Sequence, residues 1–271
     1  MKSLELCSKF AFILLAAAVF AQPVHAQAPK RINPSKIILV GDSTTAVWGG
    51  WGPSFCADHV TSFAACLNLA RGGRSSASYR AEGSWDVALG EMRVPGYHDI
   101  WVLIQFGHND QPGKPGRSTD LATEFPANLA RYVDEARAAG AKPILVTPLT
   151  RRTFKDGRLN NDLASWADAA RQIAKQKRVL LLDLNADSAA AVQAMGEAAA
   201  DRFAALPPGS MPTGQIAATP ASTELDDRPM AVPHLSFDRT HLGREGADYF
   251  AKMVAHELAT AVPKMRPLLI P

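Results

Sequence analysis

Lys36-Ile-Ile-Leu-Val-Gly-Asp-Ser-Thr-Thr-Ala46 is the stretch from which the fold can be inferred. It begins with an apolar, β-branched run that stops at Gly41, which predicts a buried strand followed by a turn. A small acid and a hydroxyl side chain follow directly. In an open α/β sheet, ligands bind just beyond the carboxyl ends of the strands. We therefore take Ser43 as the candidate nucleophile and look elsewhere in the chain for the groups that a serine nucleophile needs.

Length and composition favour a single domain. The chain has 271 residues, and 47% of them are hydrophobic, which is enough to bury a sizeable core. The formal net charge is only +3, and Lys and Arg are scattered along the chain. This distribution argues against a nucleic-acid-binding or membrane-binding surface.

The N-terminus has the pattern of a signal peptide. A basic start precedes the apolar run Phe10–Phe20, and Val24-His25-Ala26 places small residues where a signal peptidase cleaves. The apolar run is too short for a transmembrane helix. We expect residues 1–26 to be removed and residues 27–271 to form one exported domain, either periplasmic or secreted, with no membrane contact after cleavage.

Two cysteines, Cys56 and Cys66, remain after the leader is removed with Cys7. In an exported chain such a pair favours a local disulfide, and the alternative is two buried thiols. Two cysteines alone do not make a metal site.

Apolar segments alternate with helical patterns along the rest of the chain. This alternation predicts a parallel sheet covered by helices on both faces. A helix is expected from 118 to 139, with a kink or break at Pro126. Residues 205–237, rich in Pro, Ser and Thr, are expected to form a long surface loop. The expected strands are 36–40, 65–70, 100–106, 143–148 and 179–184, and the other expected helices are 54–60, 160–177, 186–204 and 243–261.

A base for Ser43 is suggested by Phe237-Asp-Arg-Thr-His-Leu-Gly243. A carboxylate at Asp238 can accept a hydrogen bond from Nδ1–H of His241, which leaves Nε2 free to face the serine and stabilises the imidazolium formed in the reaction. The alternative is that Asp238 only caps the following helix and His241 is a surface residue. Short motifs of this kind often arise by chance.

Donors for an oxyanion follow the second and third expected strands. Gly73 has no side chain, so its N–H can approach a substrate closely, and Asn109 carries an amide donor. With the N–H of Ser43 they make three donors at one sheet edge. Each of the two loops also has an ordinary explanation as a turn.

These segments together resemble the four blocks of the SGNH (GDSL) hydrolase superfamily, and within it the rhamnogalacturonan acetylesterase group. The matching segments are Gly41-Asp-Ser-Thr-Thr-Ala46, Gly50-Trp-Gly52, Asn68-Leu-Ala-Arg-Gly-Gly-Arg-Ser-Ser-Ala-Ser-Tyr79, Gly107-His-Asn-Asp-Gln111, Val146-Thr-Pro148 with Arg151-Arg152, and Asp238-Arg-Thr-His241. The resemblance implies a flavodoxin-like, three-layer α/β/α sandwich with a mostly parallel five-stranded sheet. It also implies a Ser43–His241–Asp238 triad with Gly73 and Asn109 as oxyanion donors. The Pro-rich stretch 205–237 departs from the group.

The hypothesis is therefore an exported serine esterase that removes acetyl groups from a plant polysaccharide or oligosaccharide, above all acetylated rhamnogalacturonan. We expect it to need no metal or organic cofactor and to be a monomer. Thr44, Arg74 and His108 are the expected substrate contacts. The rivals are a lipase or thioesterase, a xylan acetylesterase, a non-catalytic carbohydrate-binding protein, and a zinc deacetylase, for which the chain offers no clustered ligands. The loops after the first two expected strands suit a sugar better than a long acyl chain, because they carry Trp48, Trp51, Arg71, Arg74 and Tyr79. Ordinary packing and surface charge would explain the same residues.

Overall fold

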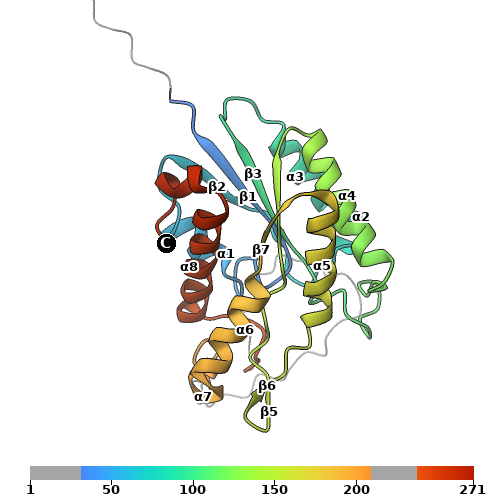
Figure 1. Ribbon diagram of the computed structural model, residues 1–271, viewed down its shortest axis with the longest axis vertical. Helices are drawn as coiled ribbons and strands as arrows, with labels where there is room; N and C mark the ends of the chain where they lie inside the picture. Colours follow the sequence, from blue (N-terminus) through green and yellow to red (C-terminus); the bar gives the residue numbers. More distant parts are fainter. Residues whose placement is uncertain (1–31, 209–236) are drawn as a thin grey trace, which may run out of the picture. The chain divides into compact units, whose positions relative to one another are not determined.

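Five strands form one parallel sheet in the order β2-β1-β3-β4-β7 (Figure 1). The structure is a computed structural model that describes residues 32–208 and 237–271, and Asn33–Pro271 belong to one compact unit. Each strand overlaps a segment expected to be one, so the prediction of a five-stranded parallel sheet is confirmed. The strands are β1 (Ser35–Gly41), β2 (Ala64–Asn68), β3 (Ile100–Gln105), β4 (Lys142–Val146) and β7 (Leu180–Leu182).

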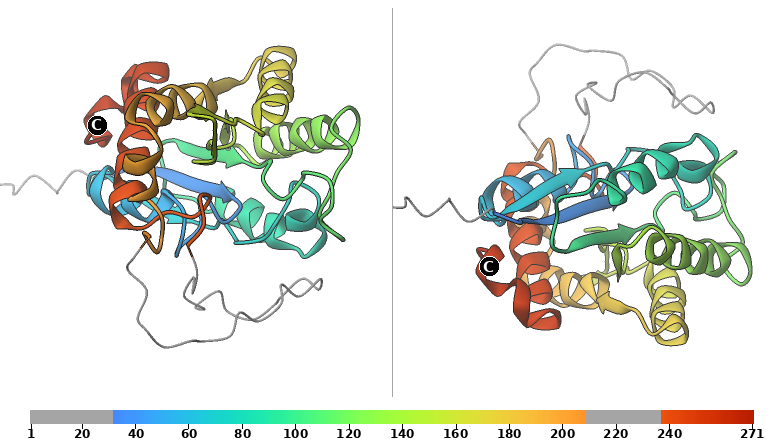
Figure 2. Two further views of the ribbon diagram at one scale, coloured as in Figure 1. Left: turned by 90° about the horizontal axis from the view of Figure 1, so that it is seen from below. Right: turned by 90° about the horizontal axis from the view of Figure 1, so that it is seen from above.

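Both faces of the sheet are covered, because successive residues of β1 enter two different cores. Ile37 and Leu39 pack on one side, and Ile38 and Val40 pack on the other. The first core contains α1 (Gly52–Asp58), α6 (Leu184–Met195) and α8 (Arg244–Ala261), and the second contains α3 (Ser84–Met92), α4 (Glu124–Ala138) and α5 (Ala164–Lys177). The layers are therefore those of an α/β/α sandwich, as Figure 2 shows from two further sides.

Helix limits differ most from the expectation in two places. Helix α4 begins at Glu124 rather than at residue 118, so Pro126 lies in its first turn, where a backbone N–H has no intrahelical partner. The expected kink at Pro126 is wrong for this reason. The expected helix 186–204 is two helices, because Gly196 takes φ +77° and ψ 167° between α6 and α7 (Glu197–Asp201).

A disulfide and several short elements complete the unit. The expected disulfide is present and joins Cys56 of α1 to Cys66 of β2. None of the helices described in residues 32–208 and 237–271 combines the length and apolar character needed to cross a bilayer. The small elements, which the sequence pattern did not predict, are α2 (Ser78–Ala81), the hairpin β5 (Phe154–Lys155) and β6 (Arg158–Leu159), and the 3₁₀ helix η1 (Pro263–Leu268).

The predicted signal peptide, residues 1–26, lies outside the described residues, as do residues 209–236 of the long loop predicted for 205–237. Both stay predictions.

Candidate active site

Ser43 occupies a tight turn at the carboxyl end of β1. Gly41 is needed there, because a Cβ at this position would lie 2.7 Å from the backbone oxygen of Gln105 on β3. The N–H groups of Thr45 and Ala46 both donate to Asp42 O and close the turn. Ser43 is thereby held on a rigid support at the sheet edge, only partly buried.

Ser43, His241 and Asp238 form a continuous hydrogen-bonded chain. Nε2 of His241 lies 2.9 Å from Ser43 Oγ, although 198 residues separate the two in sequence. Nδ1 of His241 lies 3.0 Å from Asp238 Oδ2, and Asp238 Oδ1 accepts the N–H groups of Thr240 and His241, each at 2.7 Å. Burial alone would raise the pKa of the Asp238 carboxyl, but these donors and the His241 ring hold it well below its ordinary value. The carboxylate is therefore charged and orients the imidazole.

Arg152 stabilises the backbone of the turn that carries Asp238 and His241, a role that the sequence pattern did not indicate. Its side chain is fully buried, and its guanidinium donates to His241 O at 2.8 Å, Asp238 O at 3.4 Å and Thr240 O at 3.5 Å. Its backbone N–H also donates to Arg239 O at 2.9 Å. Burial lowers the pKa of Arg152 to about 10, so the group still carries its charge at neutral pH. The one sequence signal for Arg152 is that it belongs to a segment, Val146-Thr-Pro148 with Arg151-Arg152, that resembles the rhamnogalacturonan acetylesterase group.

A second buried network lies under the nucleophile turn. Trp51 Nε1 donates to Gln105 Oε1, Gln105 Nε2 donates to Thr44 Oγ1, and Thr44 Oγ1 donates to Asp42 Oδ1, at 2.7–3.0 Å. Nδ1 of His108 lies 3.3 Å from Asp42 Oδ2. Burial opposes ionisation of Asp42, yet His108 and the Thr44 donors lower the pKa of this carboxyl, so it is charged. The network holds the backbone on both sides of Ser43.

The expectation that Thr44, Arg74 and His108 contact the substrate is corrected, because all three side chains are buried. Thr44 and His108 belong to the buried network just described and expose 0% and 2% of their surface. Arg74 exposes 4%, and its guanidinium donates to Glu82 Oε2 and to Gly72 O, both at 2.8 Å. All three side chains are turned inward, so they shape the site without facing a substrate.

The loops that carry Gly73 and Asn109 flank the end of β1, because β2 and β3 are its two neighbours in the sheet. Asn109 Nδ2 donates to Arg74 O at 3.1 Å, which ties one loop to the other and leaves a second amide hydrogen. Gly73 takes φ +76°, which favours glycine. Among the described residues, no acceptor is found for the N–H of Ser43 or the N–H of Gly73. These donors are available for an oxyanion.

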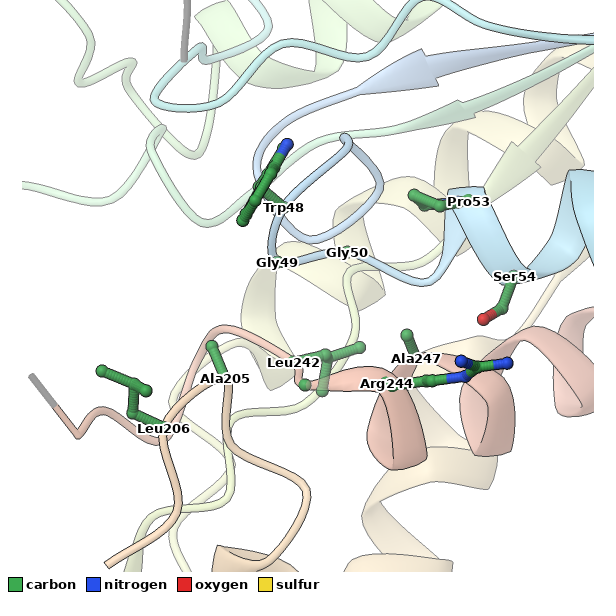
Figure 3. A pocket seen from close by; sticks show the side chains of 11 residues that line it. Trp48, Gly49, Gly50, Pro53, Ser54, Ala205, Leu206, Leu242, Arg244 and Ala247 are labelled. Carbon is green, nitrogen blue, oxygen red and sulfur yellow. The ribbon is translucent and has the colours of Figure 1, made fainter. Parts of the chain in front are cut away.

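Trp48 is the exposed aromatic residue beside the triad, with 60% of its surface accessible and φ +67°. It lines a cavity of about 400 Å³, together with Leu242, Arg244 and other residues (Figure 3). The N–H of Leu242 donates to Gly49 O at 2.8 Å, so the Trp48 loop is joined to the residue that follows His241. Of the other residues proposed for sugar contact, Trp51 and Tyr79 are buried in the core, and packing explains them.

Comparisons with known proteins place the chain among esterases. The model of the GDSL-like Lipase/Acylhydrolase family matches residues 39–249, which include Ser43 and His241. Rhamnogalacturonan acetylesterase RhgT of Bacillus subtilis (strain 168) is 33% identical over 232 residues, which are 82% of this chain and 89% of RhgT. Probable rhamnogalacturonan acetylesterase YesY of the same strain is 35% identical over 168 residues, 59% of this chain and 75% of YesY.

Among solved structures, a catalytic mutant of Axe2, an acetylxylan esterase from Geobacillus stearothermophilus, superposes with a TM-score of 0.52 at 16% identity. The superposition covers 85% of this chain and 96% of that one, and it supports the fold alone.

Proposed function

Because the chain belongs to the GDSL-like lipase/acylhydrolase family, we propose that it is a serine esterase that removes O-acetyl groups from acetylated rhamnogalacturonan. The observation that carries the esterase chemistry is the contact of 2.9 Å between Ser43 Oγ and His241 Nε2, with Asp238 on the far side of the ring. The substrate class is supported by the two relatives, one named a rhamnogalacturonan acetylesterase and the other a probable one.

The reaction proceeds in two steps through an acyl-enzyme. Ser43 Oγ attacks the acetyl carbon while His241 Nε2 takes the hydroxyl proton, and the N–H groups of Ser43 and Gly73 with the Asn109 amide stabilise the oxyanion. His241 then gives the proton to the departing sugar oxygen. In the second step water attacks the acetyl-serine with the same base, which releases acetate and restores Ser43. General-base assistance of this kind contributes about 10²–10⁴ in rate.

The decisive experiment measures acetate release with the Ser43→Ala variant. This variant should lose release from acetylated rhamnogalacturonan while unfolding at the same temperature as the wild type. Comparison of acetylated rhamnogalacturonan, acetylated xylan and an octanoyl ester separates the proposal from its rivals. Unchanged release by Ser43→Ala, or a preference for the octanoyl ester, would overturn it.

We also propose that the enzyme works outside the cytoplasm as a monomer. The apolar run Phe10–Phe20 with small residues before position 27 supports export, and the Cys56–Cys66 disulfide suits an oxidising compartment. Sequencing of the N-terminus of the mature protein should find Gln27 first, and size-exclusion chromatography tests the monomer. An intact N-terminus would contradict export by this leader.

A further inference from the structure

Two cationic side chains contact the loops that carry the oxyanion donors, Arg117 at the Gly73 loop and Lys114 at the Asn109 loop. Nη1 of Arg117 lies 3.5 Å from Gly73 O and would lie 3.6 Å from a Cβ at that glycine. The Lys114 ammonium donates to the backbone oxygen of His108, one residue before Asn109. Each of the two loops with candidate oxyanion donors therefore has one of these cations beside it.

The loop that presents them is held by its own hydrogen bonds. Thr119 N–H donates to Asp110 O at 2.9 Å, Thr119 Oγ1 donates to Asp110 Oδ1 at 3.0 Å, and Lys114 N–H donates to Ser118 Oγ at 2.9 Å. Gly113 and Gly116 take φ +82° and +71°, so the chain can reverse on either side of Lys114. A loop ordered in this way loses little further freedom when an anion binds.

The cations on this loop have no ion-pair partner within the described part of the chain. Neither Lys114 nor Arg117 forms an ion pair there, whereas the neighbouring Arg151 pairs with Asp162 at 2.5 Å. Burial and the charges of Arg151 and Arg117 lower the pKa of Lys114, and they outweigh the charges of Asp42 and Asp162, which raise it. A carboxylate that entered this position would relieve the repulsion.

We propose that Lys114 and Arg117 form a carboxylate-binding subsite that recognises a uronate residue of the polysaccharide. The subsite rests on the proposed function, because it assigns substrate selectivity to the same active site. The guanidinium group matches a carboxylate in a bidentate geometry, and the ammonium adds a point charge. A backbone of galacturonate residues supplies such carboxylates, whereas a neutral xylan backbone or an acyl chain does not.

The test compares two forms of one acetylated galacturonate-containing oligosaccharide, with free carboxylates and with methyl-esterified ones. The wild type should have a higher kcat/KM for the free acid. Lys114→Met and Arg117→Met should each reduce this preference about tenfold or more, as expected when one charge-assisted hydrogen bond is lost, mostly through KM. Arg117→Lys keeps the charge and should retain part of the preference. Lys252→Met, which removes a cation from the exposed side of α8, should behave as the wild type.

The outcomes separate the subsite from the function itself. Equal kcat/KM for the two forms in the wild type, or an unchanged preference in Lys114→Met and Arg117→Met, would refute the subsite alone. If the wild type cleaves 4-nitrophenyl acetate but releases acetate from neither oligosaccharide, the proposed polysaccharide function is refuted and the subsite with it.

Discussion

Replacement of Arg152 by Met should damage catalysis although Arg152 does not reach the substrate. Met keeps the length and the apolar character of the stem but removes the guanidinium that donates to the backbone oxygens of Asp238, Thr240 and His241. Hydrogen bonds to charged groups contribute about 1.5–3 kcal/mol each, and the one to His241 O, at 2.8 Å, has the best geometry. The three oxygens would be left without this donor in a buried setting.

The turn should shift rather than unfold, because other contacts persist. Asp238 Oδ1 still accepts two backbone N–H groups, and the N–H of Leu242 still donates to Gly49 O. We expect a loss of stability of about 2–4 kcal/mol. A displacement of the His241 ring by about 1 Å from Ser43 should lower kcat about 10²-fold. KM should change little, because the buried Arg152 makes no contact with the substrate.

The assay is the hydrolysis of 4-nitrophenyl acetate, with thermal unfolding followed on the same samples and kinetics measured well below the unfolding temperature. Arg152→Lys retains the charge but has fewer donors in a less suitable geometry, so its kcat should fall between those of Arg152→Met and the wild type. Arg131→Met removes an exposed guanidinium from α4 and serves as the matched control. A kcat of Arg152→Met within about threefold of the wild type would refute the positioning role.

Three further changes test other parts of the structure. Asn109→Ala should lower kcat for 4-nitrophenyl acetate by about 10²–10³, since one oxyanion donor is removed, and a loss below about fivefold would contradict that role. The double variant Cys56→Ser, Cys66→Ser should lose about 2–3 kcal/mol of unfolding free energy in urea, the value expected for a short closed loop, and the reduced wild type should match it. Burial beside Asp187 and Asp183 raises the pKa of Glu257 from 4.5 to about 8, so the folded protein keeps a proton that the unfolded chain releases. The contribution of Glu257 to stability is therefore greatest below pH 4.5 and declines as the pH rises to about 8. Glu257→Gln should consequently raise the free energy of unfolding above pH 8 by on the order of 2 kcal/mol and leave it nearly unchanged at pH 4. Equal effects at the two pH values would show that titration of Glu257 is not the cause.

Local patterns predicted the sheet, and together with the family resemblance they predicted the candidate triad. The strands could be found because burial on both faces leaves continuous apolar runs, as in β1. Ser43, Gly73 and Asn109 could be found because each follows such a run, and parallel strands end at a common edge. Asp238 and His241 are three residues apart, so their pairing is a local property of one turn. The helix limits were less accurate, because a proline such as Pro126 is tolerated in a first turn and excluded only further along the helix.

Only the tertiary structure decided which polar side chains at the site are buried and which of them support it. Thr44, Arg74 and His108 look like polar residues suited to a sugar, yet neighbouring loops bury them. Arg152 has the same sequence character as a surface arginine, and its role depends on a turn more than 80 residues further along the chain. Burial and hydrogen bonding between distant segments depend on how the loops meet at the end of β1, and no local pattern around Ser43 contains that information. The candidate nucleophile could therefore be identified from its own strand and turn together with the family resemblance, whereas the buried residues that support its turn could not.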